Sequence, residues 1–137
     1  MKYLYFVLFL ALIACSSSDE SSNNSNQFFN PPNWIQGTWG QINDDPYYEI
    51  PNFRFKSDDF CTIASNTELC FKESLTLSAN NGGDVNVEEN ITSTSYEVTI
   101  NQISQTINFK FIKISDNNIE FVNPNTGLPN TQLYKLD

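Results

Sequence analysis

The chain has 137 residues, among which 7 are basic, 16 are acidic and none is histidine. Its net charge of −9 repels nucleic acid and anionic lipid, so nucleic acid is excluded as the expected partner. The lack of histidine removes the usual general base near neutral pH, a common metal ligand, and every Ser-His or Cys-His catalytic pair.

The first 14 residues have the pattern of an export signal. Lys2 gives a short positive start, and residues 3–13 form an unbroken apolar run. A membrane-spanning helix takes about 20 residues, so this run instead fits the apolar region of a signal peptide. The next residues, Leu-Ile-Ala-Cys at 12–15, resemble the lipobox of bacterial lipoproteins. The resemblance implies cleavage before Cys15 and anchoring through lipid chains on that cysteine, and two or more chains bind a membrane stably.

A polar segment follows the cysteine. Residues 16–33 are rich in Ser and Asn and carry too little apolar surface to fold alone. A flexible coil of this length holds a domain roughly 20–25 Å from the lipid. Phe28 and Phe29 interrupt the polarity, and we expect them to be the first residues that dock on the domain. We therefore divide the chain into a signal peptide (1–14), a lipidated cysteine with its tether (15–33) and a folded domain (34–137).

The predicted location is the outer membrane. The Ser-Ser-Ser-Asp-Glu segment after Cys15 resembles a signal for display on the outer face of that membrane in Bacteroidetes-type bacteria. Both its periplasmic face and the cell surface remain open as the place of the anchored domain.

The folded domain is predicted to be all-β. Apolar and polar residues alternate with a period of two from residue 34 onward, without a convincing helix, and clusters of Asn, Asp, Gly and Pro separate the runs. We expect strands near 34–42, 47–56, 60–64, 68–78, 85–91, 94–101, 105–114, 117–123 and 131–136. Eight or nine short antiparallel strands suggest a small up-and-down β-barrel, with a two-sheet β-sandwich as the alternative.

Cys61 and Cys70 are an even pair once Cys15 is assigned to lipid, and exported chains retain disulfides. If Ser65 and Asn66 form a two-residue hairpin loop, Cys61 lies opposite Cys70 in a non-hydrogen-bonded pair. That pair is the closer of the two kinds in an antiparallel ladder, which suits a disulfide.

The same register places Phe60 opposite Phe71 on the other face of the hairpin, as a core contact. The face with both cysteines, Glu68 and Lys72 is then predicted to look outward.

Gly37-Thr38-Trp39 at the start of the first strand resembles the Gly-x-Trp signature of lipocalins, where the tryptophan plugs the closed end of an antiparallel barrel. The early Phe-Arg-Phe at 53–55 and the closing Leu-Tyr-Lys-Leu at 133–136 are similar to small lipocalin-like lipoproteins of Bacteroidetes. The late Thr-Asp-Tyr segment of classical lipocalins, and the arginine that covers their tryptophan, have no counterpart here. Lys135 is the candidate for that contact, through a cation–π interaction with Trp39.

The acidic residues do not suggest a catalytic or metal site. Acids are paired at 44–45, 58–59 and 88–89, but adjacent strand residues point to opposite faces, so such carboxylates do not converge. Residues 80–84 offer oxygen ligands without the regular acidic spacing of a calcium loop. The sequence therefore predicts neither an enzyme, nor a metal, nor a cofactor.

Two functions remain open. In the first, a lipid-anchored extracytoplasmic lipoprotein holds a small apolar ligand in a lipocalin-like barrel. In the second, the barrel is solid and acts as an envelope or surface protein-interaction module, for example an inhibitor of a cationic enzyme. An open apolar pocket of roughly 300 Å3 or more favours the first, and a packed interior favours the second.

The anchor leads to a direct prediction. Cys15→Ser removes the acylated sulfur, so the variant is expected to leave the membrane fraction or to remain uncleaved. Fractionation of host cells, followed by intact mass measurement, checks this. A variant that is processed and anchored like the wild type would contradict the assignment.

Overall fold

The computed structural model describes residues 27–42, 49–122 and 129–137. The predicted signal peptide, Cys15 and most of the tether lie outside these residues, as do the acidic pair at 44–45 and the turn at 123–127. The described part contains one helix, and no helix there has the length and apolarity needed to cross a membrane.

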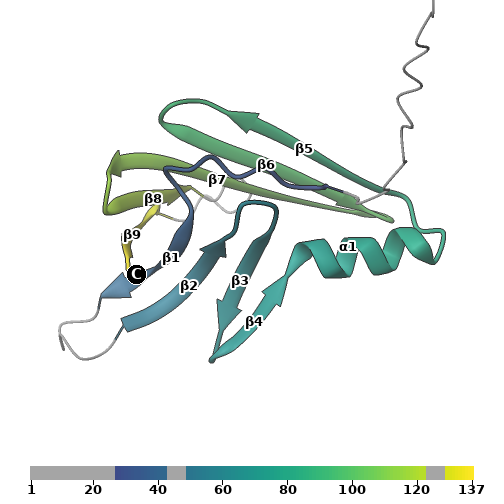
Figure 1. Cartoon of the computed structure of the whole chain (residues 1–137), viewed down its shortest axis with the longest axis horizontal. Helices are drawn as coiled ribbons and strands as arrows, with labels where there is room; N and C mark the ends of the chain where they lie inside the picture. The colour runs from purple at the N-terminus through teal and green to yellow at the C-terminus, as the bar shows by residue number, and fades with distance from the viewer. Residues whose placement is uncertain (1–26, 43–48, 123–128) are drawn as a thin grey trace, which may run out of the picture.

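Nine antiparallel strands form one sheet in the described part of the chain (Figure 1). The elements are β1 (Gly37–Ile42), β2 (Glu49–Phe55), β3 (Phe60–Ala64), β4 (Thr67–Cys70), α1 (Phe71–Asn80), β5 (Val85–Ile91), β6 (Ser95–Gln102), β7 (Gln105–Ser115), β8 (Asn118–Val122) and β9 (Thr131–Lys135). The all-β prediction is confirmed, and most strand bounds agree with the sequence-based expectation to within three residues.

The sheet is curled into a half-barrel with the strand order β4-β3-β2-β1-β9-β8-β7-β6-β5. Every strand except β4 pairs with the strand that follows it in sequence, and β1 also pairs with β9, where Trp39 lies opposite Lys135 and Gly40 opposite Tyr134. The first and last strands are thus joined, and β4 and β5 are the two edges of the described sheet. The single sheet also differs from the two-sheet alternative.

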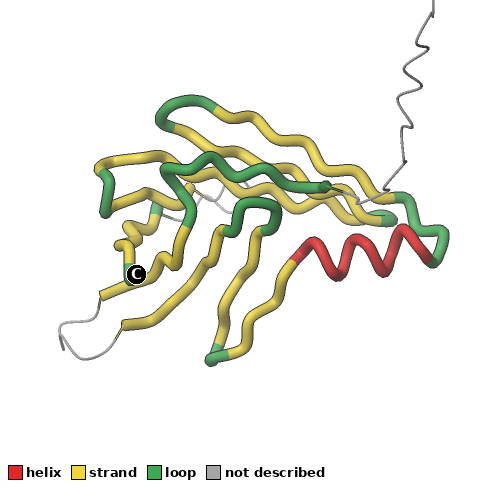
Figure 2. The backbone as a smooth tube through the Cα atoms, viewed as in Figure 1, coloured by secondary structure: helices red, strands yellow, loops and turns green. Residues whose placement is uncertain are grey.

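Between these edges lies α1, and here the sequence prediction is wrong. A strand was expected over 68–78, but β4 ends at Cys70 and α1 begins at Phe71 (Figure 2). Phe71 and Leu75 are four residues apart, so a helix turns both toward the core, and Leu75 is fully buried. Leu77, which a strand would have turned inward, is 64% exposed. The helix contacts both β3 and β5 and so covers the open side of the sheet.

Aromatic rings fill the concave face. The two ends of the curled sheet face one another (Figure 1). Rings from β2 and β3 contact rings from β6 and β7 across the interior. The centroid of Phe55 lies 5.0 Å from those of both Phe60 and Phe111, and Phe60 lies 4.8 Å from Phe109. These spacings are those of stacked and edge-to-face pairs. We refer to this set, completed by Phe53, Tyr96 and Phe121, as the aromatic core.

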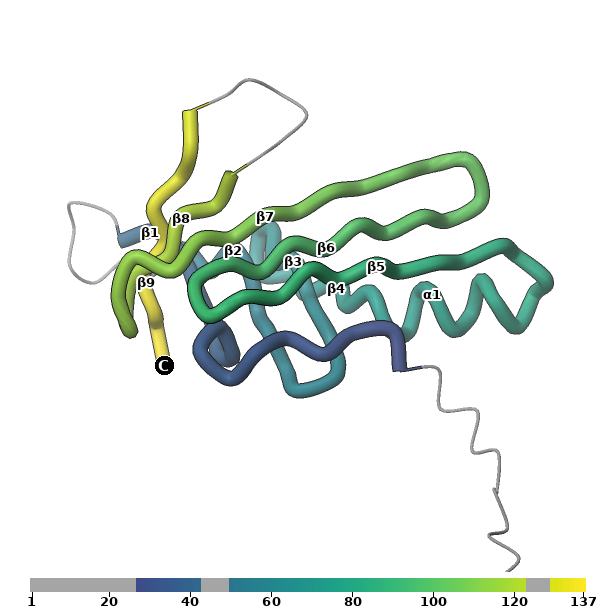
Figure 3. Tube along the Cα trace, turned by 90° about the horizontal axis from the view of Figure 1, so that it is seen from above, coloured from purple at the N-terminus to yellow at the C-terminus, as the bar shows by residue number. Residues whose placement is uncertain are grey.

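Residues 27–36, which we call the strap, run along the open side of the half-barrel beside β5 (Figure 3). Phe29 is fully buried and packs against Phe60 and Phe71, with centroids 6.5 and 6.4 Å away. The expectation that Phe29 docks on the domain is therefore confirmed. The folded part therefore begins before residue 34, within the segment 15–33 that is predicted as the tether.

Polar contacts also hold the strap. The backbone N–H of Asn30 donates to both oxygens of Glu89, at 3.0 and 2.9 Å, and the indole N–H of Trp34 donates to the Thr92 carbonyl. Glu89 also accepts from the hydroxyl of Tyr96 at 2.6 Å. Burial raises the pKa of Tyr96, so this hydroxyl keeps its proton and remains a donor.

Trp39 lies where the first and last strands meet. It is fully buried, its indole N–H donates to the Ile35 carbonyl at 2.6 Å, and the Lys135 ammonium lies 5.8 Å from its ring centroid. The predicted cation–π contact is thus present. Gly37 has φ +124°, and a Cβ there would lie 2.9 Å from Asp137 and Lys135 side-chain atoms. Only glycine adopts this backbone conformation without strain.

The burial of Trp39 predicts a large contribution of this side chain to the free energy of unfolding. Trp39→Ala removes a fully enclosed indole and should lower the free energy of unfolding by about 3–5 kcal/mol. Trp34→Ala is the matched control, because Trp34 is only partly buried against the core and should cost less. Urea melts of both variants measure the difference, and a Trp39→Ala midpoint close to wild type would show that the indole is peripheral.

Candidate functional site

The hairpin of β3 and β4 brings the two cysteines together. Ser65 and Asn66 have φ values of 48° and 63°, as a two-residue type I′ loop requires, and Ala64 pairs with Thr67. Cys61 then lies opposite Cys70, with Cα atoms 4.0 Å apart and the disulfide formed. The register predicted from the sequence is confirmed, and so is the contact of Phe60 with Phe71, whose centroids are 5.2 Å apart.

Charged side chains surround the sulfurs on the convex face. Glu68 pairs with Arg54 at 2.6 Å and with Lys56 at 3.2 Å. The ammonium of Lys56 also lies 3.5 Å from the Cys70 sulfur. Under this cover Cys61 is fully buried, whereas Cys70 is partly exposed. The predicted outward face therefore exists, but only one of its two cysteines is accessible.

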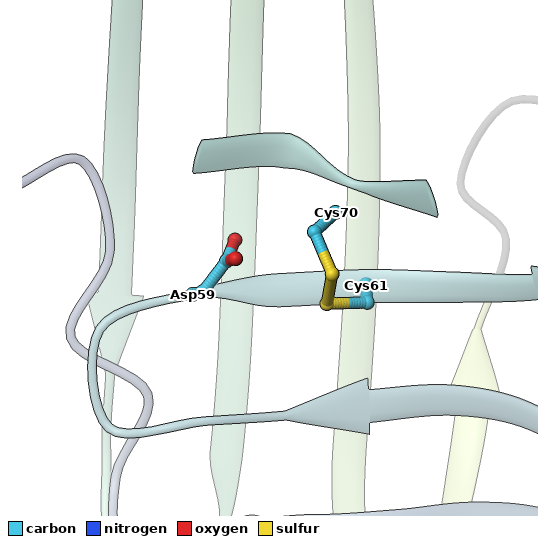
Figure 4. Close-up of side chains that lie close together, drawn as sticks. All are labelled: Asp59, Cys61 and Cys70. Atoms are coloured by element: carbon cyan, nitrogen blue, oxygen red, sulfur yellow. A yellow bond between two sulfur atoms is a disulfide. The ribbon is translucent and has the colours of Figure 1, made fainter. Parts of the chain in front are cut away.

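Asp59 lies beside the disulfide and is only 8% exposed (Figure 4). Its Oδ1 accepts the backbone N–H of Phe60 at 2.8 Å and that of Lys72 at 2.9 Å. Cys70, the N-cap residue of α1, makes no side-chain capping bond. Asp59 therefore caps the helix from the turn between β2 and β3, since its charge suits the positive helix end.

The neighbouring Asp58 has a different role. It forms an ion pair with Lys72, and this hydrogen bond and charge lower the pKa of Asp58 below its ordinary value. The two acids are adjacent in the sequence, and their positions alone do not separate these roles. No local pattern reveals the cap, because the capped residue Lys72 is 13 positions further along the chain.

Asp59, Cys61 and Cys70 form a cluster of ligand-type atoms within 4.8 Å of one another. Metals bind cysteine as the thiolate, and both sulfurs here are joined in a disulfide. The oxidised cluster is therefore not a metal centre, and its chemistry is that of a disulfide beside a carboxylate.

Two hollows follow the outer side of α1. One of about 440 Å3 is lined by Asp59, Lys72, Glu73, Thr76, Leu77 and Asn80. The other, of about 310 Å3, is lined by Glu68, Leu69, Cys70, Glu73, Ser74 and Leu77, and we call it the disulfide groove. Smaller hollows of about 240 and 210 Å3 lie beside Ile50 and beside Glu88. None of these four hollows in the described part of the chain is lined by the aromatic core.

The remaining sequence candidates occupy structural positions. Gly37 and Trp39 join the ends of the meander, Glu89 holds the strap, and Asn81 to Asp84 connect α1 with β5. Comparisons with protein-family models, with curated proteins and with solved structures gave no match to this chain.

The helix cap gives a prediction. Asp59→Ala leaves two backbone N–H groups without their acceptor and should lower the free energy of unfolding by about 1–2 kcal/mol. Asp58→Ala is the matched control, because it removes only a solvent-exposed ion pair and should leave the urea midpoint nearly unchanged. Equal midpoints for the two variants would refute the capping role of Asp59.

Proposed function

We propose that this chain is a membrane-anchored extracytoplasmic lipoprotein whose solid, lipocalin-like half-barrel acts as a protein-interaction module. One observation carries the choice of module: aromatic rings fill the concave face that would otherwise hold a ligand. The alternative is a carrier of a small apolar molecule.

The packing of the interior supports the choice. Phe53 on β2 lies 5.2 Å from Phe111 and 5.1 Å from Phe121, measured between ring centroids, so opposite walls of the half-barrel are in contact. The open side is closed by Phe29 and Leu75, which are both fully buried. The largest of the four described hollows lies along α1, and no residue of the aromatic core lines it, so it is not the barrel interior that a lipocalin-like carrier would use.

The partner is expected to be a cationic protein. The chain carries 16 acidic against 7 basic residues, and a field of this sign attracts positively charged partners and speeds their association. Glu88 and Glu97 lie in one hollow on β5 and β6, and Glu88 is exposed. A basic enzyme in the envelope, for example a lysozyme, has the matching charge. The anchor at Cys15 and the tether would present the domain within a few tens of ångströms of the membrane.

Native mass spectrometry of the protein purified from its host envelope tests the proposal. The expected mass is that of the lipidated polypeptide, alone or with a protein partner. A small apolar molecule retained in one-to-one ratio would contradict the solid-module function and return the ligand-carrying alternative.

Calorimetric titration with a lysozyme tests directly whether the chain binds a cationic protein. Binding is expected at low ionic strength and should weaken as salt is added, because the attraction is between charges on the two surfaces. Glu88→Lys should weaken it further, while Glu73→Lys, on α1 and outside the hollow that contains Glu88, serves as the matched control. The absence of binding at low salt would count against a partner of this class.

A further inference from the structure

Only one of the two cysteines of the disulfide is accessible to solvent. Cys61 is fully buried, whereas Cys70 is partly exposed and forms part of the wall of the disulfide groove. Thiol–disulfide exchange requires a thiolate to reach a disulfide sulfur directly. Access therefore selects Cys70 as the sulfur that is attacked, and it leaves Cys61 as the leaving group.

The surroundings of Cys70 suit a sulfur that carries negative charge during exchange. The Lys56 ammonium lies 3.5 Å from this sulfur, and Cys70 is the N-cap residue of the ten-residue helix α1. A nearby cation and the positive end of a helix both stabilise a thiolate. Three of the seven basic residues of the chain lie around the disulfide: Arg54 on β2, Lys56 directly after β2, and Lys72 on α1.

Two carboxylates oppose this effect, and each has partners of its own. An oxygen of Glu68 lies 3.2 Å from the Cys70 sulfur, but Glu68 is also bound by Arg54 and Lys56. Asp59 accepts two backbone N–H groups at the helix end. The charge of each carboxylate is thus partly compensated before a thiolate forms.

The groove beside Cys70 has an apolar rim. Leu69 and Leu77 line it from β4 and α1, and each is 64% exposed. Two large apolar side chains left in solvent beside an accessible sulfur favour a peptide with apolar neighbours to its cysteine over a small hydrophilic thiol.

We propose that Cys61–Cys70 is a thiol–disulfide exchange site for a cysteine pair in a partner polypeptide, which docks its apolar flanks in the disulfide groove. This inference goes beyond the interaction module proposed above and does not depend on it. The partner dithiol is the reductant, and the disulfide of this chain is the oxidant.

The reaction balances in two steps. A partner thiolate attacks the Cys70 sulfur, the Cys61–Cys70 bond breaks, and Cys61 leaves with the electron pair and takes a proton from water. The second partner thiol, after losing its proton, attacks the partner sulfur of the mixed disulfide, and Cys70 leaves as a thiolate beside Lys56. Two electrons pass to this chain, and the partner gains a disulfide.

Peptide probes test the site in the full chain. The folded protein is mixed with acetyl-Leu-Cys-Leu-amide or acetyl-Gly-Cys-Gly-amide, quenched with acid, and the mixed disulfide is mapped by mass spectrometry. We expect the adduct on Cys70 rather than Cys61, and about tenfold faster formation with the leucine peptide, since binding in an apolar groove raises the local thiol concentration. Adducts divided equally between the cysteines, or formed only in urea, would overturn the proposal.

Two variants with matched controls separate the contributions. Lys56→Met should slow the second step about tenfold, measured as release of Cys70 from the isolated adduct by added peptide thiol, because it removes the cation beside the leaving sulfur. Lys110→Met, whose lysine pairs with Glu97 elsewhere on the sheet, should not change that rate. Leu69→Ser should remove the preference for the leucine peptide, and Ile103→Ser, at another exposed apolar position, should retain it. Equal rates for the two lysine variants, or an equal preference for the leucine peptide in Leu69→Ser and Ile103→Ser, would contradict the corresponding part of the proposal. The position of the adduct in the wild-type chain is a test that does not depend on either comparison.

Discussion

The contact of Phe29 with Phe60 and Phe71 closes a sheet that does not close itself. The half-barrel joins its first strand to its last, so its opening lies between β4 and β5 in the middle of the chain. Burying a large apolar side chain stabilises a fold by roughly 1.5–3 kcal/mol, so a concave apolar face left open to water loses this stabilisation for each exposed side chain. The strap and α1 cover this opening, and the packed interior follows from their presence.

The rest of the arrangement depends on that cover. Because α1 must lie across the opening, its N-terminus comes to the end of β4, where Asp59 caps it and Cys70 begins it. The helix that completes the core thus also places the accessible sulfur, Lys56 and the two exposed leucines around one groove. The groove is lined from β4 and α1, and none of its lining residues belongs to the aromatic core.

Features that depend on residues close together in the sequence were predicted correctly, whereas most features that depend on tertiary contacts were not. The strands and the Cys61–Cys70 register depend on alternation and on one two-residue loop, which are local properties. The segment 71–80 fits both periods in part, because Phe71 and Leu75 share a face in a strand and in a helix. Tertiary context decides here, since only a helix buries Leu75 while Leu77 faces water. One local signal also indicates a helix: a strand over this segment would turn the charged Glu73 toward the core.

The candidate site was harder to predict than the fold. The disulfide could be derived from the sequence, but the helix cap from Asp59, the cation beside Cys70 and the groove all arise from side chains that are distant in the chain. The strap is a similar case: its composition resembles a tether, and only the opening between β4 and β5 explains why Phe29 and Pro31 are buried.

The central claim is that the aromatic core leaves no room for a ligand, and NMR under xenon pressure tests it most directly, because xenon enters dry apolar cavities in proteins. Phe111→Ala, which removes a fully buried ring, provides the positive control. The account predicts that xenon leaves the methyl and aromatic signals of the wild-type core without saturable shifts and shifts those of the variant. Saturable shifts of Val98, Ile100 or Leu133 signals in the wild type would reveal an interior cavity and contradict the account.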